Sequence, residues 1–214
     1  MTSTITVLLV DDHAVVREGY RRLLERDGRL KVIGEAAAAA EALALEADLE
    51  PDVVVLDIAL PGVSGIEILR RILAHRPEAR VLMFSMYQDA IFAERALEAG
   101  ARGYLSKASA PDLLVEAVRC IAAGQTYVGP DIKQALALHA SGTTELTVPL
   151  SARELEVLRL LTQGYAVNAI AERLGLSAKT VANHQSSIKQ KLGATNALQL
   201  ILIARQLGLE VIEP

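Results

Sequence analysis

The stretch that decides the fold is residues 52–65, with the sequence DVVVLDIALPGVSG. Its unbroken β-branched run is typical of a strand buried on both faces, as in a parallel sheet covered by helices. Asp57 closes this strand, and Pro61-Gly62 predicts a loop before the next helix. Open α/β folds bind their ligands at the carboxyl ends of such strands. Asp57 is therefore a nucleophile, a metal ligand or a cap for backbone donors, and its neighbours decide which.

Strand and helix patterns alternate on both sides of this stretch. We expect strands at residues 5–10, 31–34, 52–57, 80–85 and 103–105, and helices at 14–26, 36–48, 66–75, 90–99 and 112–123. Strict alternation predicts a parallel sheet with right-handed crossovers and helices on both faces. The expected fold of residues 1–124 is a flavodoxin-like, doubly wound α/β domain with five parallel strands.

Chemically active side chains stand at the ends of four of these strands. Asp11 and Asp12 follow the first strand, Asp57 ends the third, Ser85 ends the fourth and Lys107 follows the fifth. The carboxyl ends of parallel strands share one edge of the sheet, so these groups should converge. Three carboxylates raise one another's pKa unless a cation neutralises them, and hard oxygen ligands suit Mg²⁺. The set predicts phosphoryl transfer onto a carboxylate.

The chain changes character after residue 124. Gly129-Pro130 interrupts the pattern, residues 131–140 predict one short helix, and residues 141–144, SGTT, are typical of a hinge. We expect residues 125–149 to be a linker. Residues 150–214 predict an all-α domain of four short helices.

Cap residues mark the ends of these four helices. Ser151 and Glu154 form a capping box that opens the first helix, and Thr195 is expected to cap the last. In the last helix we expect Leu198, Ile201 and Leu202 to face inward.

A tight Gly-Leu-Ser turn at residues 175–177 separates the second and third of these helices and predicts a helix-turn-helix. The third helix turns Val181, Ile188 and Leu192 toward the core. Its opposite face is small and polar, which suits a DNA major groove, although many solvated helix faces look alike. Nearby basic residues favour DNA because they are available for phosphates; they are Arg153, Arg173, Lys179, Lys189 and Lys191.

We expect two kinds of DNA contact from this helix. Lys179 and Thr180 should contact phosphates, and Asn183 and Ser186 should reach base edges. The remaining candidates on the same surface are Ala182, Gln190 and Lys191.

Composition sets the remaining bounds. The 214 residues suffice for two modest domains. The formal net charge is −4, but residues 1–125 hold 14 Lys+Arg against 19 Asp+Glu, whereas residues 150–214 hold 7 against 5, so the second domain is basic. The single cysteine, Cys120, excludes an internal disulfide framework and fits a reducing cytoplasm. Neither a membrane span nor a signal peptide is apparent, and we expect a cytoplasmic protein without a membrane partner.

Two groups of motifs resemble one known family. Residues 10–13 (VDDH), 57–65, Ser85 and 96–107 (ALEAGARGYLSK) resemble the receiver domain of two-component response regulators. Residues 150–154 (LSARE), 156–158, 170–171, 176–177, 179–181 (KTV), 183–184 and 191–193 (KLG) are similar to the LuxR-type DNA-binding domain. Together the two halves resemble the NarL/FixJ family of transcriptional regulators over almost the whole chain.

The resemblance implies how the first domain binds a phosphoryl group and a metal ion. Asp57 would accept a phosphoryl group from a sensor histidine kinase. Mg²⁺ would be held by Asp12 directly and by Asp11 through water, with Asp57 and the backbone carbonyl of Ala59 completing the protein ligands.

The resemblance also implies a switch. Ser85 and Lys107 would hold the phosphoryl group. Because Ser85 would be drawn toward the phosphoryl group, Tyr104 would be able to pack inward. The phosphorylated protein would act as a homodimer on double-stranded promoter DNA, with two half-sites roughly 34 Å apart. Phosphorylation would either release the DNA-binding domain or build the dimer, and the sequence leaves both open. No enzymatic activity is expected beyond the protein's own phosphorylation and dephosphorylation.

Three positions depart from the family pattern. Leu60 replaces a frequent Met, which is a mild change. Ala59 has no side chain that could orient a hydrolytic water, which predicts slow self-dephosphorylation. Ala182 stands where family members often carry Lys, so a charged groove contact is missing and DNA binding should depend more on dimerisation.

Two other functions compete with this interpretation. A flavodoxin-like hydrolase could use Asp57 as nucleophile, but such phosphatases usually need a second Asp at the position of Ala59. A regulator that ignores phosphate and senses a small molecule or a partner protein is the other alternative. The complete set of strand-end residues argues against it.

Overall fold

Parallel strands and helices alternate through the first part of the chain, as expected. The computed structural model describes residues 4–141, 150–206 and 209. Its elements up to residue 122 are β1 (Ile5–Val10), α1 (Ala14–Glu25), β2 (Leu30–Ala36), α2 (Ala39–Leu49), β3 (Val53–Leu56), α3 (Gly65–His75), β4 (Val81–Ser85), α4 (Ala90–Glu98), β5 (Gly103–Ser106) and α5 (Pro111–Ala122). With the short strand β6 (Tyr127–Val128) included, the strand order is β2-β1-β3-β4-β5-β6, and every pairing is parallel.

Helices cover both faces of this sheet because its central strands are apolar on both sides. Val7 and Leu9 of β1 pack in a cluster with Leu24 of α1 and Leu114 of α5. The intervening Leu8 and Val10 belong to a second cluster that includes residues of α2, α3 and α4. The doubly wound α/β architecture is therefore confirmed.

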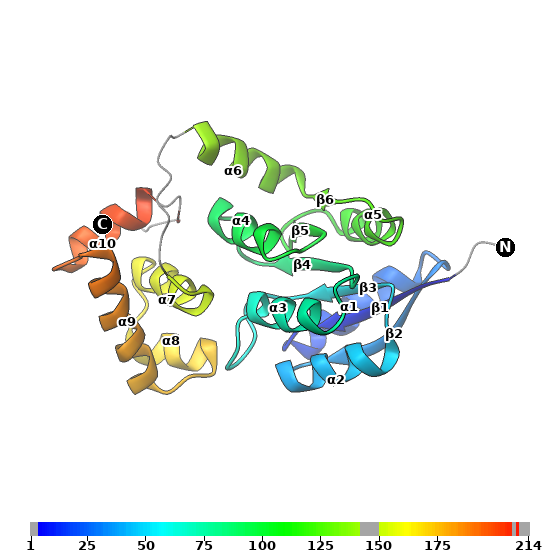
Figure 1. Cartoon of the computed structure of the whole chain (residues 1–214), viewed down its shortest axis with the longest axis horizontal. Helices are drawn as coiled ribbons and strands as arrows, with labels where there is room; N and C mark the ends of the chain where they lie inside the picture. The colour runs from blue at the N-terminus through cyan, green and yellow to red at the C-terminus, as the bar shows by residue number, and fades with distance from the viewer. Residues whose placement is uncertain (1–3, 142–149, 207–208, 210–214) are drawn as a thin grey trace.

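The sheet has six strands, whereas five were expected. The additional strand β6 (Tyr127–Val128) pairs with β5, and Gly129 N–H donates to the carbonyl oxygen of Tyr104 at 2.9 Å. A strand of two residues shows no periodicity in a sequence, so only the open edge of β5 reveals where it forms. The next helix, α6 (Pro130–Ser141), lies beside α4, where His139 pairs with Glu94 at 2.9 Å (Figure 1). The expected hinge lies outside the described residues, apart from Ser141, which ends α6.

Four helices follow, as the sequence predicts. They are α7 (Ala152–Thr162), α8 (Val167–Leu174), α9 (Ala178–Leu192) and α10 (Ala197–Gln206). The capping box is confirmed, because the Ser151 hydroxyl accepts a hydrogen bond from Glu154 N–H while the Glu154 carboxylate accepts from Ser151 N–H. Gly175, with φ of 61°, ends α8, and Ser177 caps α9, which gives the tight turn of a helix-turn-helix.

Two expectations about α10 were wrong. Asn196 caps the helix in place of Thr195, because the Asn196 side chain accepts the hydrogen bond from Gln199 N–H at 2.9 Å. Leu198 and Leu202 do not face inward, since they are 66% and 51% exposed. The buried residues are Leu200 and Ala204. The helix is apolar nearly all round, so its periodicity could not show which face would be covered.

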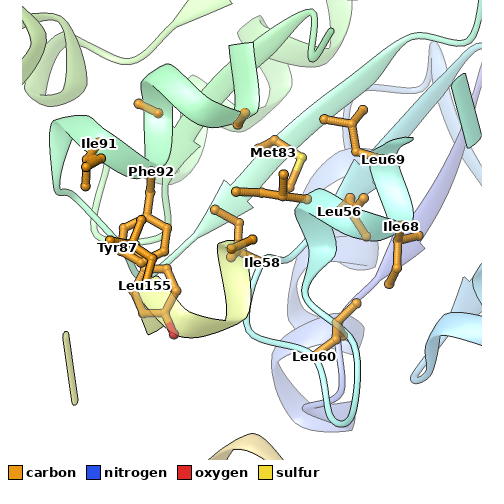
Figure 2. Close-up of a cluster of buried hydrophobic side chains, with 14 of the residues drawn as sticks. Leu56, Ile58, Leu60, Ile68, Leu69, Met83, Tyr87, Ile91, Phe92 and Leu155 are labelled. Atoms are coloured by element: carbon orange, nitrogen blue, oxygen red, sulfur yellow. The ribbon is translucent and has the colours of Figure 1, made fainter. Parts of the chain in front are cut away.

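The helical domain (residues 150–206) packs against the α/β domain (residues 4–141), and their apolar interiors are continuous. Leu155 of α7 lies against Tyr87 and Phe92 of the α/β domain (Figure 2). The helices α7 and α8 face the α/β domain, and α9 lies on their far side (Figure 1). Among the described residues, no helix has the length and apolar character that a membrane crossing requires.

Candidate functional site

Lys107 joins two carboxylates at the carboxyl edge of the sheet. Its ammonium lies 2.5 Å from Asp57 Oδ2 and 2.5 Å from Asp11 Oδ2, although these residues are 50 and 96 positions away in the sequence. All three side chains are buried. The other oxygen of Asp57 accepts a hydrogen bond from Ala59 N–H at 3.2 Å, which places the backbone of Ala59 beside the site. The predicted convergence of strands β1, β3 and β5 is therefore observed.

Burial and charge act in opposite directions on these groups. Burial raises the pKa of Asp57 above its usual value, against the opposing effect of the Lys107 charge. Burial alone would lower the pKa of Lys107, but Asp57 and Asp11 outweigh it, so the pKa of Lys107 rises and the residue stays charged. One buried cation thus faces two carboxylates, and an added positive charge would be favourable here.

A second group of possible ligand atoms lies beside this cluster. Side-chain atoms of Asp11, Asp12 and His13 lie within 4.8 Å of one another, and His13 Nδ1 is 2.8 Å from Asp12 Oδ1. His13 precedes α1, and the sequence offered no reason to include it. Asp12 is partly exposed, whereas Asp11 and Asp57 are buried. One carboxylate open to water, Asp12, stands beside two buried carboxylates, Asp11 and Asp57, that Lys107 holds, and the backbone of Ala59 adjoins them. Such hard oxygen donors suit Mg²⁺ with several waters.

Ser85 and Tyr104 complete the buried part of the site. Ser85 is fully buried at the end of β4, and its carbonyl oxygen accepts a hydrogen bond from Lys107 N–H at 2.8 Å. Tyr104 is also fully buried, and its hydroxyl donates to the carbonyl oxygen of Tyr87 at 2.8 Å. Burial raises the pKa of Tyr104 well above its usual value, so the hydroxyl stays a donor. Contacts within the protein therefore hold the Tyr104 ring inward in this structure, and its role as a switch stays a prediction.

The candidate DNA-contacting residues share an open surface on α9. Lys179, Ala182, Asn183, Ser186 and Gln190 are all exposed, while Val181 and Ile188 on the opposite side are fully buried. The predicted division of this helix into a core face and an outer face is confirmed.

Two of the candidate DNA-contacting residues on α9, Lys191 and Thr180, also form hydrogen bonds within the protein. Lys191 lies 2.7 Å from Glu154 Oε2, and Ser187 donates to Glu154 Oε1 at 2.6 Å. The hydrogen bonds to Glu154 outweigh its burial and lower its pKa to about 2. Thr180 shares a hydrogen bond with the hydroxyl of Ser177. Lys191 and Thr180 thus have roles in holding α9 against α7 and in capping it.

The contact between the two domains contains buried charged residues. One of them, Arg153, was expected elsewhere, and the others were not expected from the sequence. Arg153 was expected to be available for DNA phosphates, but it donates to the carbonyl oxygen of Leu60 at 3.1 Å and pairs with Glu156 at 2.6 Å. Arg159 pairs with Asp89 at 2.6 Å and lies over the ring of Tyr87. Burial raises the pKa of Glu156 to about 7, against the effect of Arg153. Only the docking of the two domains brings Arg153 to Leu60 and Arg159 to Asp89, so no local pattern indicates these two contacts.

The loop that follows Asp57 also contacts the helix-turn-helix through its backbone. Gly62 N–H donates to the carbonyl oxygen of Leu174, the last residue of α8, at 3.0 Å. Gly175 follows, and an added Cβ there would lie 2.9 Å from Cβ of Pro61. The phosphoacceptor candidate and the DNA-binding candidate are therefore connected by one short loop.

Comparison with known protein families matches both halves of the chain. Residues 7–119 match the response regulator receiver domain, and residues 148–204 match the bacterial regulatory proteins of the luxR family. The chain is 36% identical over 208 residues to the response regulator GacA of Pseudomonas aeruginosa, covering 96% of this chain and 97% of GacA. It is 41% identical over 197 residues to the transcriptional regulatory protein UhpA of Escherichia coli, covering 92% of this chain and 95% of UhpA.

Solved structures are also similar to this chain over nearly its whole length. RcsB from Salmonella enterica serovar Typhimurium, bound to promoter rprA in the presence of the phosphomimetic BeF₃⁻, is similar with a TM-score of 0.65 and 26% identity, covering 94% of this chain and 98% of that one. A structure of two RcsB dimers bound to two parallel DNAs has a TM-score of 0.60 and 26% identity, covering 95% of this chain and 99% of that one.

A receiver fold joined to a LuxR-type helix-turn-helix defines a DNA-binding regulator, and not a hydrolase built on the same α/β fold. The chain belongs to the two-component response regulators of the NarL/FixJ family.

Proposed function

We propose that Asp57 is the phosphoacceptor of this regulator and that a sensor histidine kinase is the donor. The observation that carries the proposal is the Lys107 ammonium 2.5 Å from both Asp57 and Asp11, in a buried site next to Ser85. One Asp57 oxygen forms a bond to phosphorus as the bond between phosphorus and the kinase histidine breaks. The imidazole leaves with the bonding electron pair and takes up a proton from water. Lys107 and the Ser85 hydroxyl then bind phosphoryl oxygens.

Asp11, Asp12, Asp57 and the carbonyl of Ala59 are the residues that would hold Mg²⁺. When bound, Mg²⁺ supplies positive charge that offsets the charge on the phosphoryl oxygens. The partly exposed Asp12 would take the direct position, since it is the carboxylate most open to water.

Exposed apolar side chains at this edge support a protein donor. Val15 at the start of α1 is 88% exposed, and Met86, directly after Ser85, is 63% exposed. Both follow strands that deliver site residues, so a partner that packs on them would bring its histidine toward Asp57.

Exposed polar groups on α9 support sequence-specific DNA binding. We assign base contacts to Asn183, Ser186 and Gln190, and phosphate contacts to Lys179 and Thr180. Ala182 lies on the same surface and leaves room for the closest approach to the groove. Lys191 contributes positive charge at this surface while it holds Glu154.

The docked arrangement favours dimer formation over uncovering as the mode of control. The α/β domain contacts α7, the end of α8 and Leu150, while the outer residues of α9 stay exposed on the far side (Figure 1). Leu198 and Leu202 lie one turn apart on α10 and form an exposed apolar pair. We assign this pair to a homodimer contact on DNA, in which two copies of α9 bind two half-sites.

The phosphoacceptor is tested with acetyl phosphate and Mg²⁺. We expect mass spectrometry to show one added phosphoryl group in the wild type and in the control Asp48→Ala, whose exposed carboxylate lies outside the site. Asp57→Ala should show none. A phosphorylated Asp57→Ala protein would refute the assignment, and a wild type that never accepts phosphate would favour a regulator that senses another signal.

DNA recognition is tested by footprinting genomic fragments with phosphorylated protein. Asn183→Ala should weaken specific binding by about 1 kcal/mol or more and relax the sequence preference, while Lys179→Ala should weaken binding to all sequences. Equal effects of both variants on all sequences would contradict the division into base and phosphate contacts.

The mode of control is tested by separating the domains. Asp89→Arg places a like charge opposite Arg159 and should open the contact between the domains. Without phosphorylation, we expect its affinity for a single half-site duplex, measured by fluorescence anisotropy, to stay within about twofold of the wild type, because binding free energy changes little when no surface is uncovered. A tenfold gain would show that docking covers the DNA-binding surface.

A further inference from the structure

A second cation lies behind the carboxylate cluster, on the first turns of α1. The guanidinium of Arg17 donates through Nη1 to the main-chain carbonyl oxygen of Asp11 at 2.5 Å and through Nε to Glu35 Oε2 at 2.9 Å. Its side chain is only 16% exposed. Arg17 also lines a small internal cavity together with Asp11 and Asp57. It contacts none of the predicted ligand oxygens.

The contact with the Asp11 carbonyl affects two side chains at once. That carbonyl belongs to the peptide unit between Asp11 and Asp12, which is planar, so its orientation determines how Asp12 leaves the strand. On the other side, Asp11 N–H donates to the carbonyl oxygen of Ala36 in β2 at 3.0 Å. Glu35 precedes Ala36, and it is the residue that Arg17 holds with its second contact. The two contacts of Arg17 therefore tie the end of β1 to β2 at the point where both acidic residues begin.

We propose that Arg17 is a positioning residue for the divalent cation site, because it fixes the peptide unit between Asp11 and Asp12. A guanidinium suits this task because its rigid fork holds two oxygen acceptors in one plane, which an ammonium group does not. Removing a residue that orients the metal ligands through hydrogen bonds commonly weakens metal binding by about 10–100-fold. The inference rests on the proposed Mg²⁺ site, and it adds a residue of α1 to the strand-end residues of that site.

The neighbouring Arg21 provides a matched control. It lies one turn further along α1 and approaches the other oxygen of the same partner, with Arg21 Nε 3.4 Å from Glu35 Oε1. Its closer partner is Glu18, at 2.6 Å. Replacing Arg21 therefore removes a charge of the same kind near Glu35 without touching the Asp11 carbonyl. If Arg17 only linked α1 to β2 through Glu35, replacing either arginine should change Mg²⁺ affinity to a similar extent.

The test is isothermal titration calorimetry of the full chain with MgCl₂. We expect Arg17→Gln to raise the dissociation constant for Mg²⁺ by about tenfold, while Arg21→Gln stays within about twofold of the wild type. At saturating Mg²⁺ the rate of phosphorylation by acetyl phosphate should return to within about twofold of the wild type in Arg17→Gln, because Arg17 does not touch the reacting atoms. Circular dichroism checks that each variant is folded.

A second pair of variants keeps the test decisive if Arg17→Gln does not fold. Arg17→Lys retains the charge but not the fork, and it should weaken Mg²⁺ binding more than Arg21→Lys does. Equal dissociation constants for the wild type and the Arg17 variants would overturn the inference, and so would equal losses in the Arg17 and Arg21 variants. Wild-type affinity in Asp12→Asn would instead overturn the proposed Mg²⁺ site, so the two failures are distinguishable.

Discussion

At the scale of single residues, Lys107 separates two buried carboxylates that would otherwise face each other. Lys107→Met should destabilise the protein by about 3 kcal/mol at pH 7.5, because it leaves Asp11 and Asp57 without their common partner. The loss should be smaller at pH 5, since burial already raises the pKa of Asp57 and a proton can replace the lost cation. Urea unfolding at the two pH values measures this.

The control for that variant is Lys31→Met, which removes an exposed lysine from β2. It should change stability by no more than about 0.5 kcal/mol. A loss in Lys107→Met that is independent of pH would contradict the role assigned to the Lys107 charge.

Ala59 is a second residue whose effect can be isolated. It is partly exposed beside the buried Asp57, and it offers only its backbone to the site. We expect phosphorylated Asp57 to persist for minutes or longer, and Ala59→Asn to shorten its lifetime about tenfold, which corresponds to about 1.4 kcal/mol of barrier, because an amide can orient the attacking water. Decay measured on phosphate-affinity gels tests this, with Ala59→Val as the control. A wild-type lifetime of seconds would contradict it.

At the scale of elements, two glycines that end helices allow a direct comparison. Gly175 and Gly193 both have a left-handed φ, 61° and 64°, but a Cβ at Gly175 would meet Pro61 whereas a Cβ at Gly193 meets nothing within 4 Å. Each Gly→Ala change should cost about 1 kcal/mol from backbone strain. Only Gly175→Ala should also break the hydrogen bond from Gly62 N–H to Leu174.

Hydrogen exchange observed by NMR can follow that hydrogen bond directly. The Gly62 amide should exchange faster in Gly175→Ala and at the wild-type rate in Gly193→Ala. Faster exchange in both variants would mean that the contact depends on general stability and not on the approach of Gly175 to Pro61.

At the scale of the whole molecule, Glu156 makes stability depend on pH through the contact between the domains. Burial raises its pKa from 4.5 to about 7. Between these values the folded state holds a proton that the unfolded chain releases, so this contribution to stability is complete below pH 4.5 and is lost as the pH rises toward 7. Relative to Glu156→Gln, the wild type should lose on the order of 2 kcal/mol between pH 5 and pH 7.5.

Thermal and urea unfolding of both proteins over this pH range measure the difference. The control Glu172→Gln changes an exposed carboxylate of α8 and should show no such trend. A difference between the wild type and Glu156→Gln that is constant with pH would show that Glu156 is already charged at pH 5.

Local periodicity explains which parts of this molecule were predictable. The run at residues 53–56 is apolar at every position, so it had to be a doubly covered strand, and the alternation of elements then placed Asp11, Asp57 and Lys107 at one edge. The core face of α9 followed from spacing for the same reason. β6 is too short for a period, and the apolar face of α10 is too uniform to show an inward side.

The sequence by itself determined the two folds, the acidic cluster and the exposed polar face of α9, because each depends on patterns within one element or on the ends of neighbouring parallel strands. Only the tertiary structure decided that Arg153 serves the contact between the domains, that Tyr104 already lies inward and that the outer face of α9 stays open. The Arg153 contact depends on how the two domains dock, and the Tyr104 contact depends on packing within the α/β domain. Both are contacts between separate elements, and no local pattern encodes them.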